Sequence, residues 1–241
     1  MKLKYGIITL MATFLFTLTA QAQNVFNEVS YSPRQTTFKL NAPKKPTLRI
    51  YEAGRGGNAI KKIKMKQTAE NVWEATVSGD LKGKFYTFDI GRGETPGVFA
   101  KAVGINGHRG AIIDMQTTNP SGWNSDHRLA LKSPADLIIY EMHHRDFSID
   151  PSSGLVNKGK FLALTEQKAI RHLEELGINA VHILPSFDFA SIDEANTTTP
   201  QYNWGYDPQN YNVPEGSYSF DAEQPTRRIL EFKQMVQALH K

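Results

Sequence analysis

A run of aromatic side chains separated by polar ones lies between residues 202 and 211. The aromatic members are Tyr202, Trp204, Tyr206 and Tyr211, and the polar ones are Asn203, Asp207 and Asn210. Aromatic rings stack on the C–H faces of sugar rings, while amides and carboxylates bind sugar hydroxyls. A core segment would instead alternate aromatic with aliphatic residues. The pattern therefore favours a carbohydrate-binding loop, and the alternative is a tyrosine-rich loop packed on its own scaffold.

Three aspartates, Asp146, Asp188 and Asp207, could supply carboxyl groups for general acid–base chemistry. A glycosidase needs two such groups, about 5–5.5 Å apart for retention of configuration and farther apart for inversion. Sequence spacing does not establish such a pair, and hydrogen bonding within loops is the simpler role for each. The adjacent His143 and His144 would point to opposite faces of a strand and could not chelate one ion together. The sequence therefore predicts no metal site, and structural roles suit both histidines.

The composition is that of a folded protein of mixed charge. The 241 residues include 28 Lys and Arg against 24 Asp and Glu, and 40% are hydrophobic, which is enough to build a core. The one local cluster of lysines, from Lys61 to Lys66, alternates with apolar residues as on a solvated strand face, so no nucleic-acid partner is expected. The chain has no cysteine, which excludes disulfides, thiolate nucleophiles and cysteine-ligated zinc.

Residues 1–22 have the features of a secretory signal peptide. Lys2 and Lys4 precede an uncharged stretch from Tyr5 to Thr19, and the small residues of Ala20-Gln21-Ala22 offer a cleavage site. The uncharged stretch is too short, and too interrupted by threonine, for a membrane-spanning helix. We therefore expect export to the periplasm or the cell exterior, with cleavage after Ala22 and no membrane association afterwards.

Residues 23–115 carry the pattern of an antiparallel β-sandwich. Short β-branched or aromatic segments alternate with turns rich in glycine and proline, and no segment has helical periodicity. The expected strands cover residues 37–40, 47–51, 72–77, 85–90 and 111–114. Trp73 is expected to fill the core rather than to form a sugar platform. Residues 116–134, rich in Asn, Pro, Ser and Gly, are expected to be a linker to the next domain.

From residue 135 onward the pattern changes to alternating strands and helices. Two apolar runs, at 137–140 and 178–184, are expected to be strands buried on both faces. A helix with Thr165 as its N-cap is expected between them, and a second helix is expected after Pro225. A long loop should cover residues 185–223. Such units are typical of a parallel α/β fold, and in a βα barrel the functional groups lie in the loops after the strands.

The segment 202–208 (YNWGYDP) resembles the signature of type I pullulanases, which are debranching enzymes of the α-amylase family (glycoside hydrolase family 13). Seven companion segments resemble the same family in the same order along the chain. They are residues 100–103, 106–111, 119–123, 145–148, 157–160, 184–189 and 214–219. The similarity extends from about residue 70 to the last residue, over most of the chain that remains after signal cleavage.

This resemblance implies an immunoglobulin-like sandwich of the carbohydrate-binding module family 48 type. It also implies a following (β/α)8 TIM barrel, of which residues 135–241 would form the first two βα units. The implied activity is retaining hydrolysis of α-1,6 branch linkages in pullulan, starch or glycogen-type α-glucans. Tyr206 would stack on the sugar next to the scissile bond, and Asn203, Trp204 and Asp207 would shape that subsite. Asp188 and the segment 141–146 would be scaffolding near the site. No cofactor is implied, while a calcium site and the oligomeric state stay open.

Two features depart from the family pattern. The family usually has Asp-Pro-Tyr upstream of Ala100, where this chain has the segment 95–99 (TPGVF), so the strap between sandwich and barrel differs. The family's catalytic carboxylates follow strands four, five and seven, whereas this sequence supplies only the first two strands. We therefore expect no catalytic residue before Lys241 and no hydrolysis by this chain alone. The alternatives are a non-catalytic secreted glucan-binding protein or another α-glucan enzyme, such as an isoamylase or branching enzyme.

Overall fold

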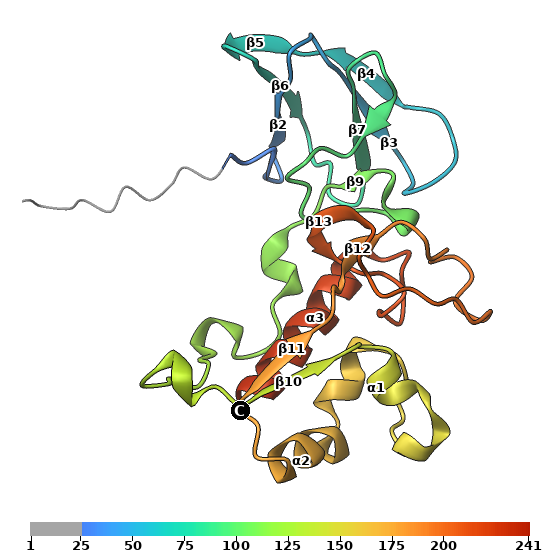
Figure 1. Ribbon diagram of the computed structural model, residues 1–241. Coiled ribbons are helices and arrows are strands. Elements are labelled where there is room, and N and C mark those ends of the chain that lie inside the picture. Colours follow the sequence, from blue (N-terminus) through green and yellow to red (C-terminus); the bar gives the residue numbers. More distant parts are fainter. Residues whose placement is uncertain (1–25) are drawn as a thin grey trace, which may run out of the picture.

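The computed structural model describes residues 26–241 and divides them into a β-rich part and a part that carries the helices (Figure 1). The predicted signal peptide, residues 1–22, lies outside the described residues. Within residues 26–241, no helix combines the length and the apolar character that crossing a membrane requires.

Two antiparallel sheets make up the β-rich part. The first has the strand order β1 (Val29–Tyr31), β2 (Gln35–Asn41), β6 (Val72–Ser78) and β5 (Lys66–Ala69). The second has the order β4 (Lys61–Lys64), β3 (Thr47–Tyr51), β7 (Phe85–Asp89) and β8 (Glu94–Thr95), and β9 (Gly110–Ala111) also pairs with β7. Antiparallel strands are thus present where the alternating sequence pattern predicts them.

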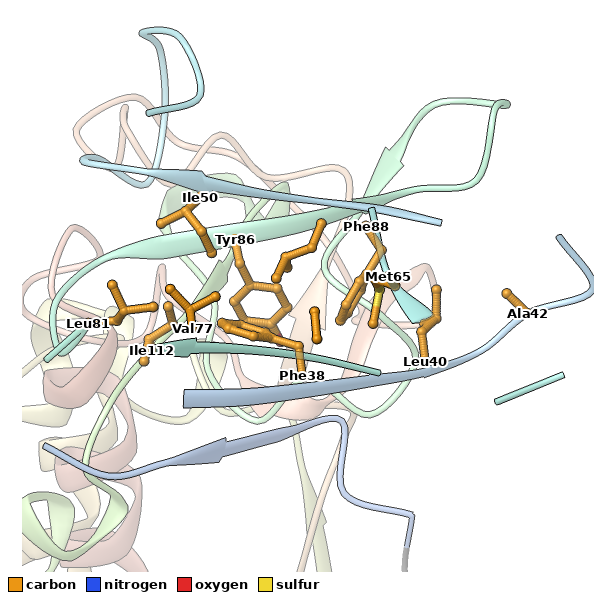
Figure 2. Close-up of a cluster of buried hydrophobic side chains, with 12 residues drawn as sticks. Phe38, Leu40, Ala42, Ile50, Met65, Val77, Leu81, Tyr86, Phe88 and Ile112 are labelled. Atoms are coloured by element: carbon orange, nitrogen blue, oxygen red, sulfur yellow. The ribbon is translucent and has the colours of Figure 1, made fainter. Parts of the chain in front are cut away.

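A shared hydrophobic core holds the two sheets together (Figure 2). Strand side chains alternate between the two faces of a sheet, so Phe38 and Leu40 of β2 point inward together with Tyr86 and Phe88 of β7. The ring centroids of Phe38 and Tyr86 lie 5.3 Å apart. Trp73 packs against this core as a half-buried residue, which is the packing role expected from the sequence.

The segment between the two parts lies along the last helix, α3 (Pro225–His240). This segment follows β9 and contains three 3-10 helices, at Met115–Thr118, Trp123–Ser125 and Pro134–Asp136. Lys233 of α3 donates from Nζ to Thr118 Oγ1 at 2.8 Å and to Asn119 Oδ1 at 2.6 Å, and Gln237 donates to the carbonyl of Ser121. The predicted linker is therefore packed along α3 and bound to it by side-chain hydrogen bonds.

The second part is built around a parallel strand pair. Strand β10 (Ile139–Met142) pairs with β11 (Ala180–Ile183) through the crossover that contains α2 (Gln167–Glu175). The remaining elements are α1 (Asp146–Ile149), two 3-10 helices at Pro151–Ser153 and Phe161–Thr165, and the antiparallel pair β12 (Phe187–Phe189) and β13 (Pro208–Pro214). A second hydrophobic core unites α2, β11 and α3. The predicted order of strand, helix, strand and helix is therefore present.

Three expectations for this part are wrong in detail. Neither the run at 137–140 nor the run at 178–184 is buried on both faces. Ile138 and Ile139 are 54% and 57% exposed, and no residue from 178 to 184 is buried. Strand β10 has β11 as its one strand neighbour among residues 26–241, and two-sided burial needs a wider, covered sheet. Thr165 does not cap α2, because its hydroxyl donates to the carbonyl of Leu162. The expected loop at 185–223 contains the β12–β13 hairpin.

Candidate carbohydrate-binding site

The aromatic loop, residues 202–207, joins β12 to β13 at the carboxyl ends of the parallel strands. Its three rings are open to solvent, with Tyr202 64%, Trp204 59% and Tyr206 66% exposed. Tyr202 and Trp204 meet edge to face, with their ring centroids 6.2 Å apart. A loop packed on its own scaffold would bury these rings, so the exposure favours the interpretation as a binding surface.

Hydrogen bonds within the aromatic loop fix its shape. Asn203 donates from Nδ2 to Asp207 Oδ1 at 2.7 Å and to Ser191 Oγ at 2.6 Å, and its Oδ1 accepts the Gly205 amide at 2.6 Å. Asp207 Oδ2 accepts the Ser191 amide at 2.9 Å. Burial acts to raise the pKa of Asp207, but the bonds from Ser191 and Asn203 outweigh it, and the pKa lies below its usual value. The side chains of Asn203 and Asp207 therefore stabilise the turn of the aromatic loop that carries Trp204 and Tyr206.

Gly205 lets the aromatic loop pass close to the end of β11. Its φ is +88°, in the left-handed region that favours glycine. A Cβ at this position would collide with the carbonyl oxygen of Pro185, directly beyond β11. The two rings that flank Gly205 are thus held over the carboxyl ends of the parallel strands, where α/β barrels carry their functional groups.

His143 connects the end of β10 to the aromatic loop. Its Nδ1 accepts the backbone N–H of Asp146 at 3.2 Å, which leaves the ring proton on Nε2. Nε2 lies 2.7 Å from the carbonyl oxygen of Asn203 and donates to it. His143 therefore has a structural role, as the sequence predicts. The sequence does not reveal its hydrogen bond to the backbone of the aromatic loop.

His144 is fully buried and turns away from His143 into the second core. Its ring centroid lies 5.0 Å from that of Phe161 and 4.9 Å from that of Tyr218. Neither ring nitrogen has a hydrogen-bond partner of good geometry among the described residues, and the Lys160 backbone opposes the effect of burial only weakly. Burial lowers the pKa of His144 to about 4, so the ring is neutral near pH 7.

Replacing His144 with leucine is expected to make the chain more tolerant of acid. The folded pKa of about 4 lies below the ordinary value of 6.5 for histidine, so the unfolded chain binds the extra proton and stability falls from pH 6.5 toward pH 4. His144→Leu removes this loss, about 1.4 kcal/mol per pH unit, and also removes an unpartnered buried polar group. Urea denaturation at pH 7.5 and pH 5 measures how the free energy of unfolding changes with pH. The control is His127→Leu, the same change at an exposed histidine. An unchanged pH slope in His144→Leu would contradict the assignment.

A buried cluster of three carboxyl groups and one guanidinium lies beneath the β12–β13 hairpin. Its members, Asp188, Glu194, Glu215 and Arg228, are all less than 5% exposed. Arg228 Nη1 lies 3.1 Å from Asp188 Oδ1 and 3.0 Å from Glu194 Oε1, and Nη2 lies 2.9 Å from Glu194 Oε2. Burial, with the charge of Glu194 as the second cause, raises the pKa of Asp188 to about 7 and that of Glu215 to about 8.

This ion cluster also joins the β12–β13 pair to the connection between β8 and β9 in the β-rich part. Glu194 Oε2 accepts the Asn106 amide at 2.7 Å, and the Glu194 amide donates to Asn106 Oδ1 at 2.8 Å. Asn210 donates from Nδ2 to Asp188 and to the carbonyl of Gly107. The three carboxylates are close enough for one metal ion, but the Arg228 guanidinium already binds two of them. The geometry is that of a structural ion cluster, and it suits Asp188 as scaffolding.

Comparison with known proteins identifies relatives along most of the chain. The chain is 35% identical over 223 residues to the pullulanase of Bacillus subtilis (strain 168), covering 87% of this chain and 30% of that protein. Its structure matches a mutant pullulanase from Paenibacillus barengoltzii complexed with maltotriose, with a TM-score of 0.86 and 42% identity over 90% of this chain and 36% of that one. The chain is homologous to pullulanases. Its mostly β fold with few helices matches that of solved pullulanase structures.

Two further comparisons qualify this homology. The chain is also 38% identical over 130 residues to isoamylase 3, chloroplastic, of Oryza sativa subsp. japonica, covering 52% of this chain and 16% of that protein. No protein-family model matches the chain. In each of these comparisons, the matched part is about a third or less of the length of the pullulanase or isoamylase relative.

Proposed function

We propose that the chain corresponds to the N-terminal portion of an exported pullulanase-type glycoside hydrolase, which cleaves α-1,6 branch linkages of α-glucans with retention. The observation that carries the proposal is the exposed aromatic loop at the carboxyl ends of β10 and β11. Homology to pullulanases supports the substrate class, since one solved relative is complexed with maltotriose. In this proposal the β-rich part is a module of family 48 type and residues 135–241 are the first two units of a (β/α)8 barrel.

The proposal gives each residue of the aromatic loop a separate role. Tyr206 stacks on the sugar next to the scissile bond, and Trp204 forms a wall of the same subsite. Asn203 and Asp207 hold the turn that carries both rings, as their mutual hydrogen bond at 2.7 Å supports. Rigid rings cost little conformational entropy on binding, which suits them as the main contacts to a sugar.

The proposal assigns catalysis to no residue between 26 and 241. Asp188 is ion-paired to Arg228, Asp207 is bonded within the aromatic loop, and Asp146 lies beside His143 and Arg145. Retaining hydrolysis needs one ionised carboxylate as nucleophile and one protonated carboxyl group as acid. We place both outside the described residues, and we propose that this chain alone does not hydrolyse glucans.

Replacing either Trp204 or Tyr206 with alanine is expected to weaken maltotriose binding about fivefold to thirtyfold, because each change removes a stacking surface worth about 1–2 kcal/mol. Isothermal titration calorimetry on the purified chain measures the affinity. The matched control is Phe220→Ala, which removes an exposed ring, 50%, that lies outside the aromatic run of residues 202–211. Unchanged affinity in both loop variants, or an equal loss in the control, would refute a site formed by the aromatic loop.

A second candidate within the same chemistry is another α-glucan enzyme. An isoamylase-type activity is favoured by the 38% identity to isoamylase 3, which extends over 130 residues. The match to the Bacillus subtilis pullulanase is longer, at 223 residues, and the YNWGYDP segment resembles the debranching signature of type I pullulanases. These two observations favour the pullulanase-type activity.

A further inference from the structure

A small pocket with a strongly cationic lining lies next to the aromatic loop. It has a volume of about 120 Å³ and is bounded by the segments at 143–149, 158–160 and 197–203. Arg145, Lys158 and Lys160 line it, together with His143, and none of its lining residues is acidic. A pocket with this lining attracts negative charge.

The amide side chains that line the pocket already form hydrogen bonds within the protein, so few acceptor atoms remain for a ligand. Gln201 Oε1 accepts the Asp193 amide, and its Nε2 donates to the carbonyls of Asp193 and Asn196. The Asn203 amide is bonded within the aromatic loop. A neutral sugar needs acceptors for its hydroxyl protons, and carboxylates are the usual ones. This pocket instead presents donors to a ligand.

The cations of the pocket differ in how far they are neutralised. Lys160 Nζ donates to the carbonyls of Ser217 and Ser219, at 2.8 and 2.9 Å, and the charges of Glu231 and Glu215, which do not line the pocket, also act on it. Arg145 lies 3.5 Å from Asp146, a partly exposed carboxylate that does not line the pocket. Lys158 has no ion pair within residues 26–241. The pocket therefore carries an excess of positive charge that a bound anion would offset.

We propose that this pocket binds a phosphate group. Arg145 offers a planar fork of N–H donors, Lys158 offers an ammonium group, and Thr197 also lines the pocket. The phosphate enters either as the free ion or as a monoester on a sugar. Because Asn203 belongs both to this pocket and to the aromatic loop, a phosphate-bearing α-glucan could contact the two together. That last step alone rests on the proposed function.

Calorimetric titration of the full chain with inorganic phosphate, glucose 6-phosphate and glucose tests this inference at constant ionic strength. We expect both phosphate compounds to bind and glucose not to bind in this pocket. Lys158→Gln and Arg145→Gln should each weaken phosphate binding about tenfold, the loss of a charge-assisted hydrogen bond. Lys62→Gln, which removes an exposed lysine on β4, is the control and should change nothing.

The outcomes separate the two sources of phosphate and the two proposals. Tighter binding of glucose 6-phosphate than of inorganic phosphate identifies a phosphorylated sugar as the ligand, and equal binding identifies the free ion. Absence of phosphate binding, or equal binding by Lys158→Gln, Arg145→Gln and the unchanged chain, overturns the inference. Maltotriose is titrated into the same samples. If maltotriose binds and phosphate does not, this inference fails and the proposed function stands.

Discussion

Replacing Arg228 with methionine is expected to destabilise the folded chain by about 3–5 kcal/mol, the cost of removing one partner from a buried ion pair. Arg228 is fully buried and is the cation that bonds both Asp188 and Glu194. Methionine keeps the unbranched shape and the helix propensity of arginine. The loss would therefore come from the unpaired carboxylates and not from α3 itself.

Urea denaturation at pH 8 and pH 5 measures this effect and separates charge from packing. Burial already raises the pKa of Asp188 to about 7 and that of Glu215 to about 8. Groups with a raised folded pKa contribute stability at low pH and lose it as the pH rises through the folded pKa. The deficit of Arg228→Met should therefore be smaller at pH 5, where these carboxyl groups hold protons in the folded chain.

A matched control for Arg228→Met is Arg171→Met, the same change at an exposed position of α2. Surface substitutions of this kind usually change stability by no more than about 0.5 kcal/mol. If Arg228→Met shows the same deficit at pH 5 and pH 8, lost packing explains it and the electrostatic account of the cluster is wrong.

The ion cluster shows what the sequence could and could not predict about the site. Asp188 was expected to be scaffolding, and the structure supports that role, but its partners come from three separate segments with no common spacing. One signal was present: Arg228 lies four residues before Phe232 and seven before the buried Met235. A charged residue on the apolar stripe of a helix implies a buried partner. The pattern does not say which acid that partner is.

The fold was predictable where the side-chain period was clear. The expected strands at 37–40, 47–51, 72–77 and 85–90 correspond to β2, β3, β6 and β7. In β2 buried residues alternate with less buried ones, whereas Phe85 to Phe88 of β7 are all buried and the strand is marked by its aromatic residues. Of the expected strand at 111–114, only Ala111 is in a strand, as the second residue of β9. The β12–β13 hairpin was missed because β13 begins and ends with proline and its register is irregular, so neither alternation nor strand propensity marks it.

Replacing Gly205 with alanine is expected to weaken maltotriose binding more than tenfold and to destabilise the chain. Alanine at a positive φ costs about 1–2 kcal/mol by itself. At this position the new Cβ would also meet the carbonyl oxygen and ring of Pro185. Pro185 is anchored beyond β11, so the aromatic loop would have to move away from the strand ends, taking Trp204 and Tyr206 with it.

The control for Gly205→Ala is Gly83→Ala, which isolates the backbone cost from the collision. Gly83 has a similar φ of +82°, and an added Cβ there would meet nothing within 4 Å. Gly83→Ala should lose about 1–2 kcal/mol of stability and keep its maltotriose affinity. If Gly205→Ala also keeps its affinity, the rings do not depend on the close approach to Pro185. Loss of affinity in Gly205→Ala alone would instead show that binding requires the loop to lie over the ends of β10 and β11.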